Sequence, residues 1–365
     1  MDDRLYWLWL AGGLGFAARQ LRPLLETYTD AAGVFAHRGE LLVKRLVTPA
    51  QFRALKNSRP QDFERVLEQH LAAGYQILAL DDPDYPELLR EIDDPPAVLY
   101  VEGNLSVFQH ALPISMIGTR RPSAYGIEAA RMIAGQLVAA GALLISGLAD
   151  GLDSEAHKAA VAVGAPTVAV LGTAIDRTYP ARNQTLREMI LHDGAVISEY
   201  PIGTEGQKSF FVLRNRIIAG LCRGLLVVEA RQRSGTMSTV QFALENGRDV
   251  FAVPGSIFSP VSAGTNRLLQ QGAKAVMTAD DILCEYGYEM CSEPAQLPGD
   301  APKDEPALSE QAQAVYRLLT ARPQGLEALC AASGLPSGVV MAALTELELA
   351  GLSRQLAGRQ FERCG

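Results

Sequence analysis

Nine short apolar runs between residues 76 and 277 constrain the fold of this 365-residue chain more than any other feature. They are separated by glycine, proline and segments of helical length. Runs that are apolar on both faces are typical of buried parallel strands, and the segments between them supply crossover helices. We therefore predict a mostly parallel, doubly wound sheet of Rossmann type, whose ligands bind beyond the carboxyl ends of the strands. The predicted strands cover residues 76–80, 97–101, 113–117, 142–146, 167–171, 195–198, 225–229, 249–253 and 275–277.

The residues on either side of this sheet have a different character. Residues 1–76 show apolar side chains at three- and four-residue spacing, which predicts a helical domain of SAM or helix-hairpin-helix type. Within it, Gly13-Leu14-Gly15 resembles a helix-hairpin-helix turn that could bind a phosphate, although a plain helical turn is the simpler interpretation. Prolines at 294, 298, 302 and 306 predict a linker over 287–306, so the sheet domain covers 77–286 and a last domain covers 307–365.

The last domain has the pattern of a winged helix, with predicted helices over 309–319, 326–331 and 336–349 and a hairpin with Gly358 at its tip. Winged helices often bind DNA, but the helix that would enter a groove carries no lysine or arginine. The charges also balance, because arginines at 317, 322, 354, 359 and 363 oppose glutamates at 310, 327, 346, 348 and 362. A DNA contact, a protein contact and a structural role all remain open for this domain.

Composition limits the class of ligand that the protein can bind and the cellular compartment in which we expect it. A net charge of −8 and a pI near 5.3 argue against a protein that coats nucleic acid with its whole surface, while a local basic patch stays compatible. The five cysteines form no CxxC pair, so we expect neither disulfides nor a metal site, and no cofactor. The N-terminal apolar run is short and broken by glycine, so we expect a cytoplasmic protein without a membrane span.

A basic segment, Lys208–Thr239, contrasts with this acidic background. Counted from residue 205, six cations oppose two acids, which gives a net charge of +4. Ser234, Gly235 and Thr236 then open a helix whose first amides are free to bind an anion. The segment predicts a phosphate site, from which we leave out Arg223 because it directly precedes a strand. The cations are Lys208, Arg214, Arg216, Arg223, Arg231 and Arg233, and the acids are Glu205 and Glu229.

Three further loops follow strand ends and carry groups suited to phosphate. The first combines a glycine and paired arginines with a helix start, which favours anions, although an ordinary strand-to-helix turn also explains it. The second begins with a serine and a glycine, and the third adds an arginine at a helix start. The residues are Gly118, Arg120 and Arg121 in the first loop, Ser146 and Gly147 in the second, and Arg182 in the third.

Signals for catalysis are weak. Asp153 and His157 lie four residues apart and could form a general-base pair, but a helix start with a buried histidine that bonds a hydroxyl or carbonyl is the preferred interpretation. The chain has no GxGxxG motif followed by an acid and no GxxxxGK[ST] motif, so we expect neither a dinucleotide cofactor nor phosphoryl transfer. Arginines interleaved with aromatics suit a flexible single strand of nucleic acid. Those aromatics are Tyr125, Tyr179, Phe210 and Phe211.

Seven motifs within residues 76–285 resemble, in this order, the DprA/Smf family of DNA-processing proteins of natural transformation. They read GTRRPSAYG, SGLADGLDSEAH, AVLGTAIDRTYPARN, ISEYP, RNRIIAGL, VVEARQRSGTMSTVQFALENGRDVFAVPG and GTNRLLQQGA. The helical first domain and the winged helix also resemble the layout of many members. The resemblance implies an extended Rossmann fold that dimerises and binds single-stranded DNA without sequence preference. It further implies a non-catalytic protein that protects incoming DNA and loads the RecA recombinase on it during homologous recombination.

The resemblance also implies which residues bind DNA. They are Gly118, Arg120, Ser146, Gly147, Arg214, Asn215, Arg216, Ser234, Gly235 and Thr236, to which the basic and aromatic pattern adds Arg121, Arg182, Lys208 and Phe211. The family commonly has Phe-Pro before its x-Arg-Asn-Arg, whereas this chain has Phe211-Val212-Leu213, so no proline fixes the loop shape there. The alternative is a nucleotide phosphoribohydrolase on a related Rossmann fold, with Glu245 as its acid. Its expected Gly-Gly-x-Gly-Thr turn reads Arg-Ser-Gly-Thr here.

Overall fold

The computed structural model describes residues 2–109, 112–288, 308–320, 324–350, 352–356 and 360–363. The chain divides into two units, residues 1–290 and 291–365. The linker predicted for 287–306 lies outside the described residues except for its first two positions. Because the first unit contains the sheet, it also contains the strand ends at which a ligand was expected.

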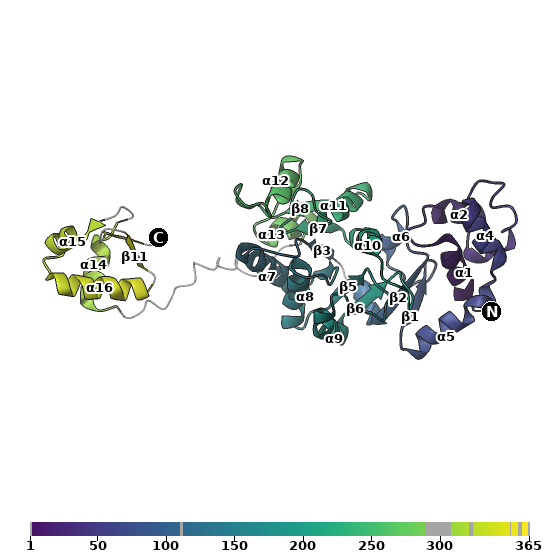
Figure 1. Cartoon of the computed structure of the whole chain (residues 1–365), viewed down its shortest axis with the longest axis horizontal. Coiled ribbons are helices and arrows are strands. Elements are labelled where there is room, and N and C mark those ends of the chain that lie inside the picture. The colour runs from purple at the N-terminus through teal and green to yellow at the C-terminus, as the bar shows by residue number, and fades with distance from the viewer. Residues whose placement is uncertain are drawn as a thin grey trace. The chain divides into compact units, whose positions relative to one another are not determined.

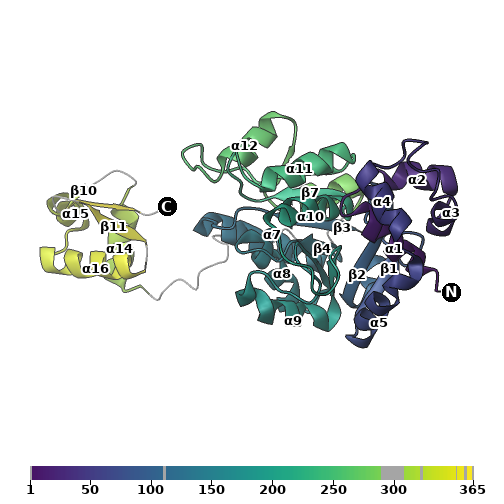
Figure 2. The same ribbon diagram turned by 45° about the vertical axis from the view of Figure 1, so that its right-hand side comes forward.

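Nine strands form the central sheet of the first unit (Figure 1; Figure 2). They are β1 (Gln76–Ala79), β2 (Val98–Gly103), β3 (Pro113–Ile117), β4 (Leu143–Ser146), β5 (Thr167–Leu171), β6 (Ala195–Ser198), β7 (Gly224–Val227), β8 (Asp249–Ala252) and β9 (Lys274–Ala275). Their order is β1-β2-β6-β5-β4-β3-β7-β8-β9. The pairs β1–β2 and β2–β6 are antiparallel and all other pairs are parallel. The nine predicted strands and the mostly parallel sheet are confirmed.

Helices cover both faces of the sheet, because consecutive strand residues point to opposite sides. In β7, Leu225 and Val227 pack into one hydrophobic core and Leu226 into another. Helices α10 (Lys208–Gly220) and α11 (Thr236–Glu245) contribute to the first core, and α7 (Ala124–Ala139) and α8 (Leu152–Ala162) to the second. The other helices of this region are α6 (Glu87–Arg90), α9 (Gln184–Asp193), α12 (Ala263–Gln270) and α13 (Asp280–Leu283).

Five helices precede the sheet, which confirms the helical prediction for the N-terminal region. They are α1 (Arg4–Leu14), α2 (Leu21–Tyr28), α3 (Ala31–Ala36), α4 (Pro49–Asn57) and α5 (Glu64–Ala72). Their apolar side chains, including Trp9 and Leu55, belong to the same core as β1 and β2, so these helices pack directly on the sheet domain. Gly13 lies inside α1, and a Cβ there would come within 2.2 Å of the Leu55 side chain. This role in the α1–α4 contact favours the simpler interpretation of Gly13-Leu14-Gly15.

The second unit is a winged helix, as predicted. It contains α14 (Glu310–Leu318), α15 (Leu326–Ser333), α16 (Ser337–Leu349), β10 (Gln324–Gly325), β11 (Ser353–Leu356) and β12 (Gln360–Arg363). The strands form a sheet in the order β10-β12-β11, and Val315, Leu329, Leu347 and Phe361 lie in its separate core. The hairpin tip at Gly358 lies outside the described residues. Across the described parts of the chain, no single helix has both the length and the apolar character needed to cross a membrane.

Candidate nucleic-acid interface

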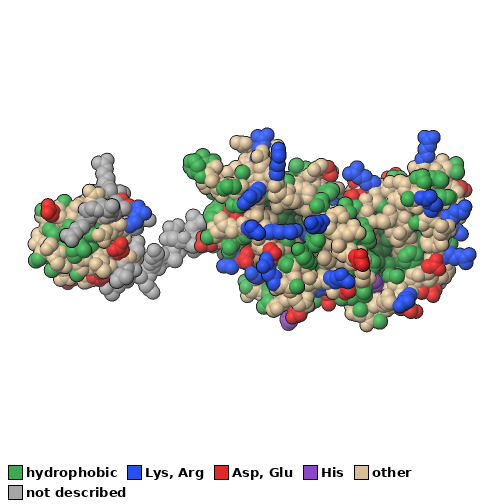
Figure 3. All heavy atoms as spheres, viewed as in Figure 1, with side chains coloured by type: hydrophobic (Ala, Val, Ile, Leu, Met, Phe, Trp, Pro, Cys, Tyr) green, Lys and Arg blue, Asp and Glu red, His purple; other side chains and the backbone are tan. Residues whose placement is uncertain are grey.

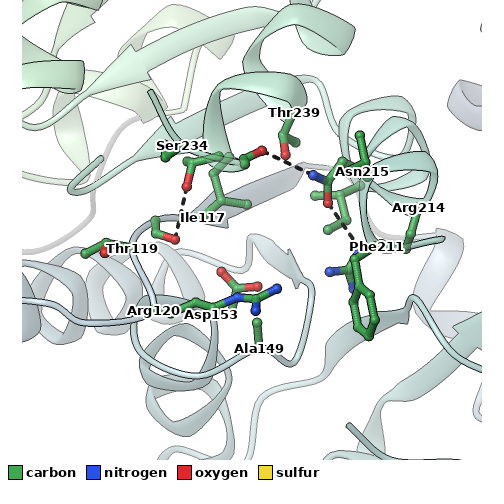
Figure 4. A pocket seen from close by; sticks show the side chains of 15 residues that line it. Ile117, Thr119, Arg120, Ala149, Asp153, Phe211, Arg214, Asn215, Ser234 and Thr239 are labelled. Atoms are coloured by element: carbon green, nitrogen blue, oxygen red, sulfur yellow. Dashed lines mark hydrogen bonds between the residues drawn. The ribbon is translucent and has the colours of Figure 1, made fainter. Parts of the chain in front are cut away.

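A pocket of about 310 Å³ opens at the carboxyl edge of the sheet, where the loops after β3 and β7 face α10 (Figure 4). Strands β3 and β7 are parallel neighbours with Ile117 opposite Val227, so the loops that follow them emerge side by side. The pocket brings together eight predicted DNA-binding residues from three separate parts of the sequence. They are Gly118, Arg120, Phe211, Arg214, Asn215, Ser234, Gly235 and Thr236.

Arg120 provides a free positive charge in this pocket. Its side chain is exposed and has neither an ion-pair nor a hydrogen-bond partner among the described residues. The guanidinium lies 6.0 Å from the ring centroid of Phe211, and the ring of Tyr179 lies 5.2 Å from the same ring. Such an arginine can bind a phosphate while the neighbouring rings stack with bases.

Arg214 has a different role, because its side chain is only 4% exposed. The guanidinium donates a hydrogen bond of 2.8 Å to the carbonyl oxygen of Gly147 and another to that of Val170. Burial lowers the pKa of Arg214 to about 10, and the nearby Asp153 carboxylate opposes this change. Arg214 therefore holds α10 against the ends of β4 and β5. Contacts with a ligand would come from the exposed residues around it.

The N-terminus of α11 forms the opposite wall of the pocket. Asn215 Nδ2 donates to Ser238 Oγ at 3.0 Å, and Thr236 Oγ1 donates to the carbonyl oxygen of Gly118 at 3.3 Å. The N-cap residue is Gly235, which has no side chain to cap the helix. Ser234 Oγ is buried and has no hydrogen-bond partner among the described residues. The amides of Met237 and Ser238 already donate to the carbonyl oxygens of Ser234 and Gly235. The amides of Gly235 and Thr236, at the positive end of the helix, therefore suit an anionic oxygen such as that of a phosphate.

The N-terminus of α7, which the sequence suggested as a further phosphate site, is already occupied. The carboxylate of Glu229 accepts hydrogen bonds from Ser123 N at 3.0 Å and from Ser123 Oγ at 2.6 Å. Ser123 Oγ in turn accepts a bond from Gly126 N at 3.1 Å and caps the helix. Because an acid of the protein takes this position, the helix N-terminus available to an anion is that of α11.

Three predicted DNA-binding residues are buried in the fold and do not line the pocket. Ser146 Oγ donates to a backbone carbonyl oxygen of β3 at 2.6 Å, and the carbonyl oxygen of Gly147 accepts the bond from Arg214. Arg216 is fully buried and donates to Glu199 Oε1 at 2.6 Å. Contrary to the prediction, the structure places Arg216 away from the surface on which a DNA strand could lie, because an ion pair holds its guanidinium inside the protein.

The remaining predicted residues lie on the surface. Arg182 pairs with Asp150, which reduces its availability to a phosphate, whereas Arg121 and Lys208 are exposed without lining the pocket. Figure 3 shows lysine and arginine side chains gathered over this face of the sheet domain. Arg223 lies at the start of β7, so the structure supports leaving it out of a site at the other end of that strand.

The interpretation of His157 as a buried structural histidine is confirmed. Its ring is fully buried, and Nδ1 lies 2.9 Å from Thr167 Oγ1, whose own proton is donated to the Leu144 carbonyl oxygen. Nδ1 is therefore the donor in the bond to Thr167. Burial lowers the pKa of His157 to about 3 and keeps the ring neutral. Asp153 does not pair with this histidine and lines the floor of the pocket instead.

Phe211 lies in the first turns of α10 and not in a loop, so helix geometry fixes its position without the proline of the family pattern. Gly172 makes room for it, because a Cβ there would come within 2.8 Å of the Phe211 ring. Glu245, the acid of the hydrolase alternative, is exposed near the end of α11, bonds Gln241 and does not line the pocket. The structure thus supports the ring of Phe211 as part of the site, but it gives no such support to Glu245.

Sequence reasoning missed some of the pocket. Thr119, Ala149 and Thr239 line it, but although they lie within the quoted motifs they were not named as candidate ligands. Thr239 lies three residues after Thr236, so helix periodicity could have placed it on the same face of α11. Tyr179 was noted as an aromatic residue, but its 5.2 Å approach to Phe211 depends on tertiary structure and had no local signal.

Comparison with known proteins agrees with this geometry. The family model for DNA recombination-mediator protein A matches residues 76–287, and the model for the DprA winged helix domain matches residues 299–359. Protein Smf of Synechocystis sp. is 36% identical over 331 residues, which cover 81% of this chain and 82% of that protein. The DNA processing protein DprA of Streptococcus pneumoniae is 41% identical over 224 residues, covering 60% of this chain and 79% of that protein.

Two solved structures are similar as well. The X-ray structure of DNA processing protein A from Streptococcus pneumoniae matches with a TM-score of 0.66 and 34% identity, covering 77% of this chain and 96% of that one. DNA processing protein A from Helicobacter pylori, described for its single-stranded DNA binding mode, matches with a TM-score of 0.54 and 28% identity. That match covers 59% of this chain and 97% of the Helicobacter chain.

Proposed function

The chain belongs to the DNA recombination-mediator protein A family, and from this premise we propose that it binds single-stranded DNA without sequence preference. The observation that carries the proposal is the unpaired guanidinium of Arg120 beside the ring of Phe211 in the pocket at the sheet edge. The Helicobacter pylori relative, described for a single-stranded DNA binding mode, supports the same class of ligand.

We expect the sugar–phosphate backbone to run from Arg120 to the N-terminus of α11, where the amides of Gly235 and Thr236 receive a phosphate. The rings of Phe211 and Tyr179 offer faces on which bases stack. The side-chain donors of Asn215 and Thr236 already serve bonds within the protein. Because stacking accepts every base and few donors are left to read base edges, binding tolerates any sequence.

The family resemblance also supports a wider proposal. The protein acts as a homodimer that protects incoming single-stranded DNA and loads the RecA recombinase on it during transformation, with no catalysis of its own. Light scattering measures the molar mass in solution and so tests the homodimer. A species that stays strictly monomeric with and without oligonucleotide would contradict the dimer. The rate of RecA filament assembly on coated single-stranded DNA, with and without this protein, measures loading, and an unchanged rate would contradict that step.

The central test is a titration of labelled single-stranded and double-stranded oligonucleotides at several salt concentrations. We expect tighter binding of the single strand and an affinity that falls linearly on a log–log plot against salt. No binding at about 50 mM salt, where phosphate contacts are strong, would refute the DNA proposal. Release of free base from AMP by the purified protein would instead support the phosphoribohydrolase alternative.

A further inference from the structure

A loop after β8 displays two large hydrophobic side chains to solvent. It covers residues 254–262, and we call it the Phe258 loop. Phe258 is 90% exposed and Ile257 is 84% exposed, and in the described part of the chain no large hydrophobic side chain is more exposed than Phe258. Neither residue lines the pocket that contains Arg120 and Phe211, which we call the DNA pocket. Hydrophobic side chains that stay exposed side by side among polar residues are typical of a binding surface.

The Phe258 loop and the DNA pocket lie at the same edge of the sheet. Strands β3, β7 and β8 are parallel neighbours, with Ile117 opposite Val227 and Val227 opposite Ala252, so the three strands end in register. Neighbouring strands lie about 5 Å apart, and the loops that follow them therefore emerge in one row. A DNA strand that leaves Arg120 and passes the loop after β7 reaches the Phe258 loop next.

Hydrogen bonds hold both ends of the Phe258 loop. The hydroxyl of Tyr125, in the first turn of α7, donates to the carbonyl oxygen of Pro254 at 2.7 Å. Asn266 in α12 accepts a bond of 3.2 Å from Gly255 N and donates one of 2.9 Å to the Gly255 carbonyl oxygen. The loop is thus ordered before any partner arrives, which reduces the entropy cost of binding.

The charges around the loop favour a polyanion. Arg121, Arg231 and Arg233 are exposed, and their side chains have no ion pair or hydrogen bond among the described residues. Residues 250–279 contain no aspartate or glutamate. Figure 3 shows hydrophobic side chains at the end of the first unit beside α12, with lysine and arginine side chains nearby. Two copies that met symmetrically at this surface would bring like charges together, whereas DNA neutralises them.

We propose that Phe258 stacks with a base of the single strand after the strand has left the DNA pocket. The protein then holds bases at two places, Phe211 inside the pocket and Phe258 outside it, while Arg231 and Arg233 bind phosphates between them. Stacking accepts every base, so this second contact preserves binding without sequence preference. The inference rests on the proposed function, because it extends the path of the same DNA strand.

Fluorescence anisotropy with labelled oligothymidines of about 6 and about 16 nucleotides tests this path, since single-strand sites span lengths of this order. Phe258→Ala should weaken binding of the longer oligonucleotide about tenfold and that of the shorter one much less. Phe258→Leu removes the ring but stays hydrophobic and should behave like Phe258→Ala, whereas Phe258→Tyr keeps the ring and should bind as the parent does. Val163→Ala is the control, because Val163 is 62% exposed and follows α8, before the start of β5.

Fluorescence of Phe258→Trp reports the contact directly. The longer oligonucleotide should quench it strongly and the parent only weakly, because Trp7 and Trp9 are at most 3% exposed. Absence of this quenching, or full affinity of Phe258→Ala or Phe258→Leu for the longer oligonucleotide, would overturn the inference while binding by the parent upholds the DNA proposal. Loss of the dimer mass in Phe258→Ala would also overturn it and assign the loop to a second copy. A parent that binds neither oligonucleotide would refute the DNA proposal itself.

Discussion

Arg214 donates a hydrogen bond of 2.8 Å to the carbonyl oxygen of Gly147, which ties α10 to the end of β4. Arg120 reaches the same pocket from the loop after β3 but has no ion-pair or hydrogen-bond partner within the described structure. Two arginines of one pocket therefore have different tasks. Arg214 maintains the shape of the pocket, and Arg120 stays available to a phosphate. Replacing each in turn separates these tasks.

Arg120→Ala should weaken binding of single-stranded oligonucleotides about tenfold on every sequence, because a phosphate contact is lost and no base contact is changed. The slope of log affinity against log salt should fall by about one. Fluorescence anisotropy at several salt concentrations measures both quantities. Arg223→Ala is the matched control, since Arg223 is an exposed arginine at the opposite end of β7 and should not affect binding. A loss confined to certain sequences would mean that Arg120 reads bases.

Arg214→Ala should lower the free energy of unfolding by about 2–4 kcal/mol. The change removes the bonds to Gly147 and Val170 and leaves the buried Asp153 carboxylate with Arg120 as its remaining nearby cation. Chemical denaturation measures the loss. Arg214→Lys keeps the charge but not the guanidinium, so its free energy of unfolding should lie between those of the parent and of Arg214→Ala. A variant that is as stable as the parent yet fails to bind DNA would make Arg214 a direct ligand contact.

Phe211→Ala should weaken oligonucleotide binding by about 1–3 kcal/mol through the loss of one stacked base. The salt slope should stay unchanged, because no charge is removed. Tyr179→Phe keeps the neighbouring ring and should bind as the parent does. If Phe211→Ala lowers the salt slope as much as Arg120→Ala does, the ring serves to position the Arg120 guanidinium above it and not to stack with a base.

The strands could be predicted because a strand buried on both faces leaves a continuous apolar run, as in residues 167–171. The direction of β1 and β2 could not be predicted in this way. Strands β1 and β2 have the same apolar character as the parallel strands, yet β2 pairs antiparallel with both β1 and β6. Strand direction depends on how the connecting chain returns to the sheet, and an apolar run contains no information about that path.

The site shows a similar limit, for which Arg214 and Arg216 are the clearest case. Side chains two residues apart on a helix point in directions that differ by about 200°. Arg214 and Arg216 therefore cannot both face the pocket. Which of them does so depends on packing, because Glu199, 17 residues earlier, binds Arg216 inside the protein. In the same way, Glu229 accepts hydrogen bonds from Ser123, 106 residues earlier, and so occupies the N-terminus of α7 that looked open in the sequence. Local motifs identified the loops. Acids distant in the sequence decide which arginines and helix N-termini remain available to a phosphate.

His157 should make the stability of the protein depend on pH. Burial lowers its pKa from 6.5 to about 3 in the folded state. As the pH falls below about 6.5 the unfolded chain takes up the proton first, so stability should be complete above that pH and fall by up to about 1.4 kcal/mol per unit below it. Denaturation at about pH 7.5, 6.5 and 5.5 measures this slope, which His157→Gln should reduce and the exposed-residue control His37→Gln should not. Equal slopes in the parent and His157→Gln would show that the folded protein also binds this proton.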